Sequence, residues 1–376
     1  MRISRFLCLV AAVTSLLCAQ TPEERQRFQQ IQERHRQGLP ISDEDMQFAK
    51  AMMAKMRNSP QNRQQQQRER EVFMKEHPPQ DATGLVALPD LGKGTYKGFE
   101  GGLYPGGQNT PPAAHLEAGM KAAKSVVPLD AGGQPAPDGK IVLLSCGMSN
   151  TTMEFQYFVR HGMADVARNP HVLIVDGAQG GQTARVTANP QANYWKVDDE
   201  RLAAAGATAK QVQVVWIKQA NARPTEGFPE AAKILANDVT GTLHVLKDRF
   251  PNLKIAYLSS RIYAGYATSP LNPEPYSYEG GFSMKWVIAD QIAGKPELNY
   301  DPAKGAVRAP WLAWGPYLWT DGLKGRTMDS LVWLKDDVVE ADRTHPSDPA
   351  GREKVAAMLL AFFKTDPTAK VWFLKP

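Results

Sequence analysis

The sequence predicts an α/β fold in which helices cover both faces of a parallel sheet. From residue 140 onward, short apolar runs alternate with longer segments of helical periodicity. This alternation is typical of strand–helix–strand units, whose parallel strands are buried on both faces. With 376 residues, 43% of them hydrophobic and 22% charged, the chain can form a large core without disulfides.

Four apolar runs are the predicted strands, and a fifth short strand is expected near Leu331 to Leu334. The runs span residues 140–145, 172–175, 212–217 and 254–259. The segments with helical periodicity span residues 152–167, 230–250, 282–293 and 350–364. Ligands of such sheets bind beyond the carboxyl ends of the strands, so the residues that follow each strand are the candidates for chemistry.

The first 19 residues are predicted to be a secretory signal peptide. Arg2 and Arg5 give a positive start, residues 6–18 are apolar, and Ala19 is a small residue at the expected cleavage point. The apolar run is too short for a comfortable membrane span. Lipid attachment at Cys18 is disfavoured because leucines precede it. We therefore expect a secreted or periplasmic protein that is not inserted in a membrane after cleavage.

Cleavage would leave Cys146 as the one remaining cysteine, which excludes an internal disulfide. The formal net charge of +5 falls to +3 without the two arginines of the signal peptide. A net charge this small produces no strong electrostatic field, so nothing indicates a nucleic-acid partner. The histidines that might bind a metal lack ligand spacing, and we expect no metal and no other cofactor. They are His115, His161, His171 and His244.

Residues 20–80 are predicted to be a polar, Gln- and Arg-rich helical segment that precedes a folded domain at residues 81–376. Thr21-Pro22-Glu23-Glu24 has the form of a capping box at a helix start. A second helix carries methionines at helical spacing, and these could form a docking arm. Since little apolar surface is available to bury, a weakly stable spacer is the favoured interpretation. The methionines are Met46, Met53 and Met56.

The first predicted strand runs into Cys146-Gly147-Met148-Ser149-Asn150, behind which a helix opens. A serine there lies near a helix N-terminus, whose free N–H groups favour a developing negative charge. A helix cap explains Ser149 equally well. Cys146 is disfavoured as a nucleophile because a lone cysteine inside a strand end is normally inert packing.

Two further strand ends carry weaker signals. The second strand leads into residues 176–184, where glycines expose backbone N–H groups, although paired glycines usually form turns. The third strand leads to Asn221, although a single asparagine is usually a loop residue.

Asp342-Arg343-Thr344-His345 lies just before the last predicted helix. An acid three residues before a histidine can reach its Nδ1, which fixes the tautomer and leaves Nε2 to take a proton from serine. Ser149, His345 and Asp342 are therefore the predicted catalytic triad. A Gly-x-Ser-x-Gly nucleophile elbow is not present because Thr151 occupies its last position.

The order and spacing of these blocks over residues 140–365 resemble the SGNH (GDSL-like) hydrolase family, closest in style to its carbohydrate acetylesterases. Ser149 matches the nucleophile block, Gly181 the glycine block and Asn221 the asparagine block, while the closing block is Asp342 with His345. The resemblance implies a three-layer α/β/α sandwich with a parallel flavodoxin-like sheet. It also implies an oxyanion hole made by the N–H groups of Ser149 and Gly181 and the side-chain amide of Asn221.

The resemblance further implies a serine esterase that removes short acyl groups from a small-molecule or polysaccharide ester. Trp311 and Trp314 lie in an aromatic stretch that could stack on sugars or, as is favoured, pack a loop onto the core. Arg261 and Tyr263, beyond the fourth strand, are the other candidates for substrate contact. Two alternatives stay open, namely a lipid or acyl-thioester hydrolase and a catalytically inactive carbohydrate-binding envelope protein.

Overall fold

The structure is a computed structural model that describes residues 21–36, 42–57 and 60–375. The predicted signal peptide therefore lies outside the described residues. Among the residues that are described, no helix is both long and apolar enough to cross a bilayer. The chain divides into two compact units, Met1–Pro78 and Pro79–Pro376.

In its described residues, 21–36, 42–57 and 60–78, the first unit contains three helices. They are α1 (Pro22–Arg36), α2 (Asp43–Arg57) and α3 (Pro60–Glu76). The predicted capping box is present, since Thr21 Oγ1 accepts the Glu24 N–H at 3.1 Å and the Glu24 carboxylate accepts the Thr21 N–H at 3.0 Å. A small apolar cluster joins α1 to α2, and Met53 packs against it. Its buried members are Phe28, Ile31, Ala49 and Met52.

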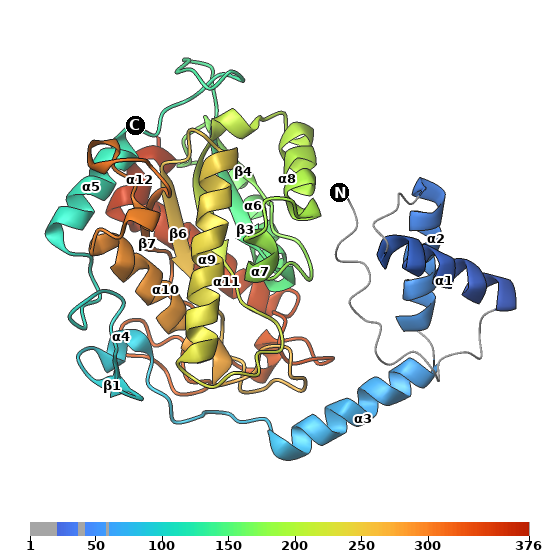
Figure 1. Cartoon of the computed structure of the whole chain (residues 1–376). Coiled ribbons are helices and arrows are strands. Elements are labelled where there is room, and N and C mark those ends of the chain that lie inside the picture. The colour runs from blue at the N-terminus through green and yellow to red at the C-terminus, as the bar shows by residue number, and fades with distance from the viewer. Residues whose placement is uncertain (1–20, 37–41, 58–59, 376) are drawn as a thin grey trace. The chain divides into compact units, whose positions relative to one another are not determined.

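The second unit is built on a five-stranded sheet whose paired strands all run parallel. The strands are β3 (Ile141–Gly147), β4 (Val172–Val175), β5 (Val212–Lys218), β6 (Ile255–Ser259) and β7 (Trp311–Trp314). Their spatial order is β4-β3-β5-β6-β7. Figure 1 shows β6 and β7 toward one side of this sheet and β3 and β4 toward the other. Numbered from the first strand of this sheet, that order is 2-1-3-4-5, the flavodoxin-like order. The predicted fold class is confirmed.

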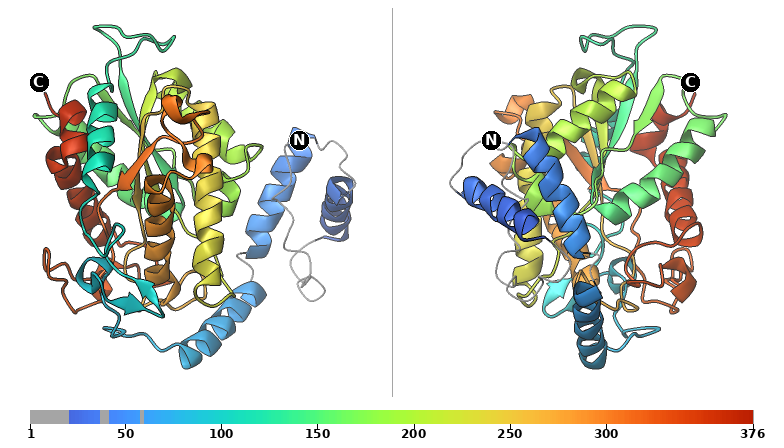
Figure 2. Two further views of the ribbon diagram at one scale, coloured as in Figure 1. Left: turned by 60° about the vertical axis from the view of Figure 1, so that its left-hand side comes forward. Right: turned by 90° about the vertical axis from the view of Figure 1, so that its right-hand side faces the viewer.

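Helices cover both faces of the sheet. One layer contains α5 (Ala113–Lys124), α6 (Ser149–Ala164), α11 (Ala350–Thr365) and α12 (Pro367–Phe373). The other contains α7 (Ala184–Thr187), α8 (Asn193–Ala204), α9 (Glu230–Arg249) and α10 (Tyr276–Ile292). In the right-hand view of Figure 2 the red helices α11 and α12 and the yellow helix α9 lie on opposite sides of the strands.

Smaller elements fill the connections. They are α4 (Leu88–Leu91), the two-stranded pair β1 (Thr95–Tyr96) and β2 (Phe99–Glu100), and 3₁₀ turns at Ala209–Gln211, Pro296–Leu298, Pro302–Lys304 and Lys335–Asp337. The sequence did not predict α5 or α8. It placed the start of α6 at Thr152, whereas the helix begins three residues earlier, at Ser149.

The predicted fifth strand near Leu331 to Leu334 is wrong. The fifth strand is β7, whose residues are all buried and which pairs with β6 from Trp311 to Trp314. Leu331 is only partly buried and Leu334 is exposed, and a 3₁₀ turn follows them. β7 is the edge strand next to β6, but α5 and α10 cover its two faces, so its residues must be apolar on both sides, a condition that the tryptophan-rich segment meets.

The centre of the sheet is almost entirely apolar. Residues 212–217 of β5 are all buried, and their side chains are aliphatic or aromatic except that of Gln213. The strand nevertheless ends on Lys218, whose side chain is 1% exposed. A buried ammonium needs a partner of opposite charge, and the position of that partner links the sheet to the candidate site.

Candidate active site

The carboxyl ends of the central strands bring the predicted site residues to one edge of the sheet. Gly147 at the end of β3 pairs with Lys218 at the end of β5, and Lys218 pairs with Ser259 at the end of β6. The three strands therefore end at the same level. Ser149 follows two residues after β3, as the first residue of α6.

Ser149, His345 and Asp342 form a continuous chain of hydrogen bonds. The Ser149 Oγ lies 2.6 Å from His345 Nε2, and His345 Nδ1 lies 2.5 Å from Asp342 Oδ2. Asp342 Oδ1 accepts the backbone N–H groups of Thr344 at 2.9 Å and His345 at 3.1 Å. The serine and histidine are 196 residues apart in sequence, so the fold itself creates this contact.

The electrostatics of Asp342 favour one proton arrangement. Burial acts to raise the pKa of Asp342, but the hydrogen bond from the His345 ring and the two backbone N–H donors outweigh it, and the pKa is lowered. An ionised Asp342 beside Nδ1 favours the tautomer with its proton on Nδ1. His345 Nε2 is then the acceptor of the Ser149 hydroxyl proton, the arrangement that a serine nucleophile requires.

The first two turns of α6 are attached to the end of β5. Thr151 Oγ1 donates to the Lys218 carbonyl at 2.7 Å and accepts the Met148 N–H at 3.3 Å. The Lys218 ammonium pairs with the carboxylate of Glu154, which is fully buried. These contacts fix the backbone that carries Ser149 at a helix N-terminus.

Cys146 is fully buried within β3, and burial raises the pKa of its thiol to about 12. A neutral thiol inside a sheet is a poor nucleophile. Its position agrees with the packing role that the sequence favoured over a catalytic one.

The glycine loop, defined as residues 176–182, follows β4 and approaches the nucleophile. A Cβ built on Gly180 would lie 3.9 Å from the Cβ of Ser149. Gly181 is exposed and has φ +74°, a left-handed conformation that glycine adopts without strain. Gly180 is therefore beside Ser149, whereas a Cβ built on Gly181, the residue predicted for the glycine block, would meet nothing within 4 Å, and the use of the Gly181 N–H in an oxyanion hole stays a prediction.

Asn221 lies at the same edge of the sheet but is already engaged. Its Nδ2 donates to Asp238 Oδ2 at 2.7 Å, and its Oδ1 accepts the Arg185 N–H at 3.2 Å. The residue lines a cavity of about 170 Å³ with Thr183 and Arg223. One amide hydrogen is not used in these two contacts, and the role of Asn221 in an oxyanion hole also stays a prediction.

Trp311 and Trp314 pack in the core, the role that the sequence favoured over sugar stacking, whereas the substrate contact considered for Tyr263 disagrees with its burial. Both tryptophans belong to β7, and their indole N–H groups donate to the carbonyls of His115 at 3.0 Å and Leu103 at 2.6 Å. Tyr263 is fully buried and donates to a backbone carbonyl. Rings held in the core have no face available for a sugar.

The predicted substrate contact of Arg261 disagrees with its position, because its side chain is buried against the segment of residues 342–345. Its residue is 3% exposed, and Nη2 donates to the carbonyl of Thr344 at 3.3 Å. Arg261 therefore braces the segment between Asp342 and His345.

Sequence reasoning missed several polar residues behind the site. Asp176 accepts hydrogen bonds from Ser145 Oγ at 2.7 Å and from Thr152 Oγ1. Asp176 could have been found from its position directly after a strand. Lys218 could have been found because it is a cation at the end of an apolar run. Within the described ranges, no group of three His, Cys, Asp or Glu side chains is placed to hold a metal ion.

No protein-family model and no curated protein matches the chain. Among solved structures, the periplasmic domain of a lipopolysaccharide acetyltransferase from Salmonella ser. Paratyphi A is similar over 60% of this chain and 83% of that domain. The identity is 13% and the TM-score 0.32, a likeness too slight to carry an argument about activity. The resemblance to SGNH hydrolases therefore rests on the sequence blocks.

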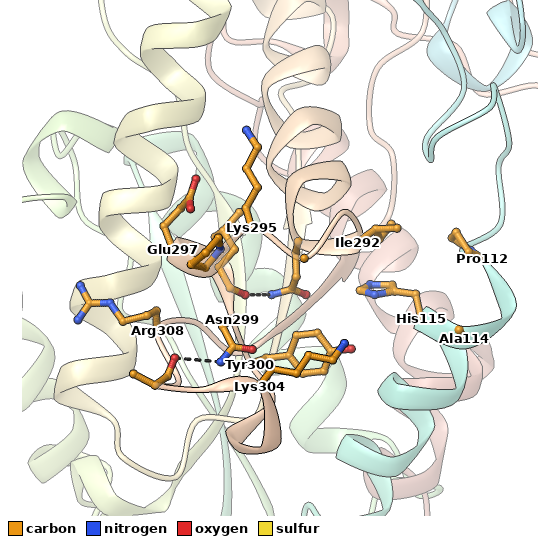
Figure 3. A pocket seen from close by; sticks show the side chains of 15 residues that line it. Pro112, Ala114, His115, Ile292, Lys295, Glu297, Asn299, Tyr300, Lys304 and Arg308 are labelled. Atoms are coloured by element: carbon orange, nitrogen blue, oxygen red, sulfur yellow. Dashed lines mark hydrogen bonds between the residues drawn. The ribbon is translucent and has the colours of Figure 1, made fainter.

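A larger cavity, of about 570 Å³, lies at the opposite edge of the sheet, where β7 begins. It is bounded by the start of α5, the end of α10 and the segment 296–308, and Figure 3 shows the side chains that line it. His115 points into it from α5, and its Nε2 contacts the Leu312 carbonyl at 2.7 Å. None of Ser149, Asp342 and His345 lines this cavity, so its size does not make it the candidate active site.

Proposed function

We propose that the chain is a serine hydrolase of SGNH type that cleaves carboxylic esters, with short acyl esters of carbohydrates as its substrates. The observation that carries the proposal is the hydrogen-bonded series Ser149–His345–Asp342, with the serine at a helix N-terminus. A structural hydroxyl cap would not need a histidine that an ionised carboxylate orients.

In the proposed reaction, His345 Nε2 takes the proton of Ser149 as Oγ attacks the ester carbonyl carbon. The carbonyl electron pair moves to oxygen, and this oxyanion is stabilised by the N–H groups at the start of α6 and in the glycine loop. Collapse of the tetrahedral intermediate expels the alcohol, which receives the proton from the imidazolium. Water, deprotonated by His345, then attacks the acyl-serine carbonyl carbon. The bond to Ser149 Oγ breaks, Oγ takes the proton back from the imidazolium, and the acid is released.

Each oxyanion donor contributes on the order of 3 kcal/mol to transition-state stabilisation. Candidate donors are the backbone N–H groups of Ser149 and Gly181 and the side-chain amide of Asn221. The reaction needs no cofactor, because the nucleophile, the base and the oxyanion donors all come from the chain.

The deciding experiment is labelling of residues 20–376 with a fluorophosphonate probe, with hydrolysis of p-nitrophenyl acetate and of an acetylated oligosaccharide measured in parallel. Ser149→Ala should lose labelling and both hydrolytic activities. Ser125→Ala, an exposed serine at the end of α5, is the matched control and should retain all three.

Other outcomes would identify the alternatives. Preference for long over short p-nitrophenyl acyl chains would favour a lipid or acyl-thioester hydrolase. A folded wild-type protein that binds the oligosaccharide but neither labels nor hydrolyses would be a carbohydrate-binding protein, and the proposal would be wrong.

A further inference from the structure

We infer that Arg201, on α8, is a positioning residue that holds the glycine loop in the conformation needed for oxyanion binding. This inference rests on the proposed function. Arg201 does not reach the reacting atoms, and its effect is transmitted through the backbone of residues 176–182.

Arg201 binds the main chain of the glycine loop directly. Its Nη1 donates to the carbonyl of Asp176 at 2.8 Å and to the carbonyl of Ala178 at 2.7 Å. The same nitrogen lies 3.8 Å from Asp176 Oδ2. Hydrogen bonds from a charged donor are stronger than neutral ones. One guanidinium therefore fixes two peptide carbonyls on either side of Gly177.

The sheet holds the same stretch from the other side. Ser145 Oγ accepts the N–H groups of Gly177 at 3.1 Å and Ala178 at 3.2 Å, and donates to Asp176 Oδ1 at 2.7 Å. The N–H groups of Gly177 and Ala178 are thus bound by β3, and the carbonyls of Asp176 and Ala178 are bound by α8. A peptide bound on both sides cannot rotate freely.

A second contact comes from the same face of α8. Gln179 Nε2 donates to Asp198 Oδ1 at 3.1 Å and to the Tyr194 carbonyl at 2.9 Å. Tyr194, Asp198 and Arg201 are spaced by four and three residues, so they lie along one side of the helix. The buried side of α8 is therefore turned toward the glycine loop.

The part of the loop beside Ser149 consists of two glycines without side chains of their own, and its one side-chain hydrogen bond among the described residues is a long one, from Gln182 Nε2 to the Gly180 carbonyl at 3.4 Å. Gly180 and Gly181 are both exposed, and they follow directly after the fixed residues. The direction of their N–H groups therefore depends on the peptides that Arg201 and Ser145 restrain, together with the Gln179 N–H, which the Gly147 carbonyl accepts at 3.0 Å. A misplacement of about 1 Å can cost about a hundred-fold in rate. Loosening the loop should thus reduce kcat more than it weakens substrate binding.

Arg201→Met removes the donors and keeps most of the aliphatic stem, and Arg201→Lys keeps the charge with altered geometry. Arg249→Met is the matched control. Arg249 Nη2 contacts α8 at Asp199, at 2.6 Å, and at the Trp195 carbonyl, at 3.3 Å. Both contacts are made to α8 itself, so this variant tests whether any loss of support for α8 has the same effect.

The measurements are kcat and KM for p-nitrophenyl acetate, the inhibition constant of an alkyl boronic acid as an oxyanion analogue, and the thermal midpoint. Arg201→Met should lower kcat by about ten-fold to a hundred-fold and raise KM less than about three-fold. The inhibition constant of the boronic acid should rise in parallel with the loss of kcat. Arg201→Lys should recover part of the loss, and Arg249→Met should stay within about two-fold of wild type.

An unchanged kcat in Arg201→Met would overturn the inference, and so would an equal loss in Arg249→Met at a similar thermal midpoint. If Arg201→Met is too unstable to assay, Arg201→Lys decides between the same outcomes. Failure of the proposed function is distinguishable, because the wild-type protein itself would then show neither labelling at Ser149 nor turnover.

Discussion

Asp342 binds His345 at two places. Its Oδ2 lies 2.5 Å from the ring Nδ1, while its Oδ1 accepts the backbone N–H of the same residue at 3.1 Å. The carboxylate thus orients both the imidazole and the main chain that carries it. The carbonyl of Thr344, between the two residues, is bound by buried Arg261. The histidine is held independently of any substrate.

Replacing Asp342 by Ala should lower kcat less than replacing His345 by Ala. The acid only orients and stabilises the imidazole, whereas the histidine itself moves the proton. We expect a loss of up to about 10⁴-fold for Asp342→Ala and a larger loss for His345→Ala. Initial rates with p-nitrophenyl acetate measure both. Equal losses, or full activity in Asp342→Ala, would contradict the assigned roles.

The contact between Asn221 and Asp238 gives a second prediction. Asn221→Ala should lower kcat more than it raises KM if the amide binds the oxyanion. Asp238→Ala should act in the same direction but less strongly, because it removes the 2.7 Å contact that orients the amide and leaves the amide in place. Steady-state kinetics of the two variants provide the comparison. An unchanged kcat in Asn221→Ala would remove this residue from the site.

The buried pair of Glu154 and Lys218 should be costly to break and much less costly to replace. Burial raises the pKa of Glu154 and lowers the pKa of Lys218 to about 8, so the surroundings disfavour both charges and the pairing offsets this. Glu154→Gln leaves an unpaired buried ammonium and should reduce the free energy of unfolding by about 3–5 kcal/mol.

The double variant Glu154→Leu with Lys218→Met tests this reasoning. It removes both charges at similar volume and should recover most of the lost free energy. Urea unfolding followed by tryptophan fluorescence measures both variants. A double variant as unstable as Glu154→Gln would mean that packing, rather than the uncompensated charge, causes the loss.

The local parts of the site could be predicted from the sequence, and the tertiary parts could not. Asp342 and His345 are three residues apart, and Ser149 follows a recognisable strand, so rules of spacing and strand ends located them. Asn221 was located by the same rule. Its side chain binds Asp238 on α9, and no local sequence pattern predicts that contact.

Among the elements that were missed, β7 and α8 were missed for identifiable physical reasons. The segment of β7 is flanked by Pro310 and Pro316, which made its tryptophans resemble a loop rather than a strand. In α8 the buried side includes Asp198, so a search for an apolar stripe does not detect the helix. Because Arg201 lies on α8, its contacts with the glycine loop were missed together with that helix.

Glu274 should make the stability of the domain depend on pH. Its carboxylate accepts the N–H groups of Ala264 at 2.9 Å and Tyr278 at 3.0 Å and the Trp319 indole N–H at 2.7 Å. Burial outweighs these donors and raises the pKa of Glu274 from 4.5 to about 7. In this interval the folded state binds the proton and the unfolded state does not.

The contribution of Glu274 to stability is therefore complete below about pH 4.5 and is lost as the pH rises through about 7. The free energy of unfolding should fall by about 3 kcal/mol over this interval relative to Glu274→Gln, which cannot titrate. Urea unfolding of both proteins across the interval measures the difference. Parallel pH profiles for the wild type and the variant would show that Glu274 ionises in the folded protein as it does in the unfolded chain, because its three N–H donors then compensate for its burial.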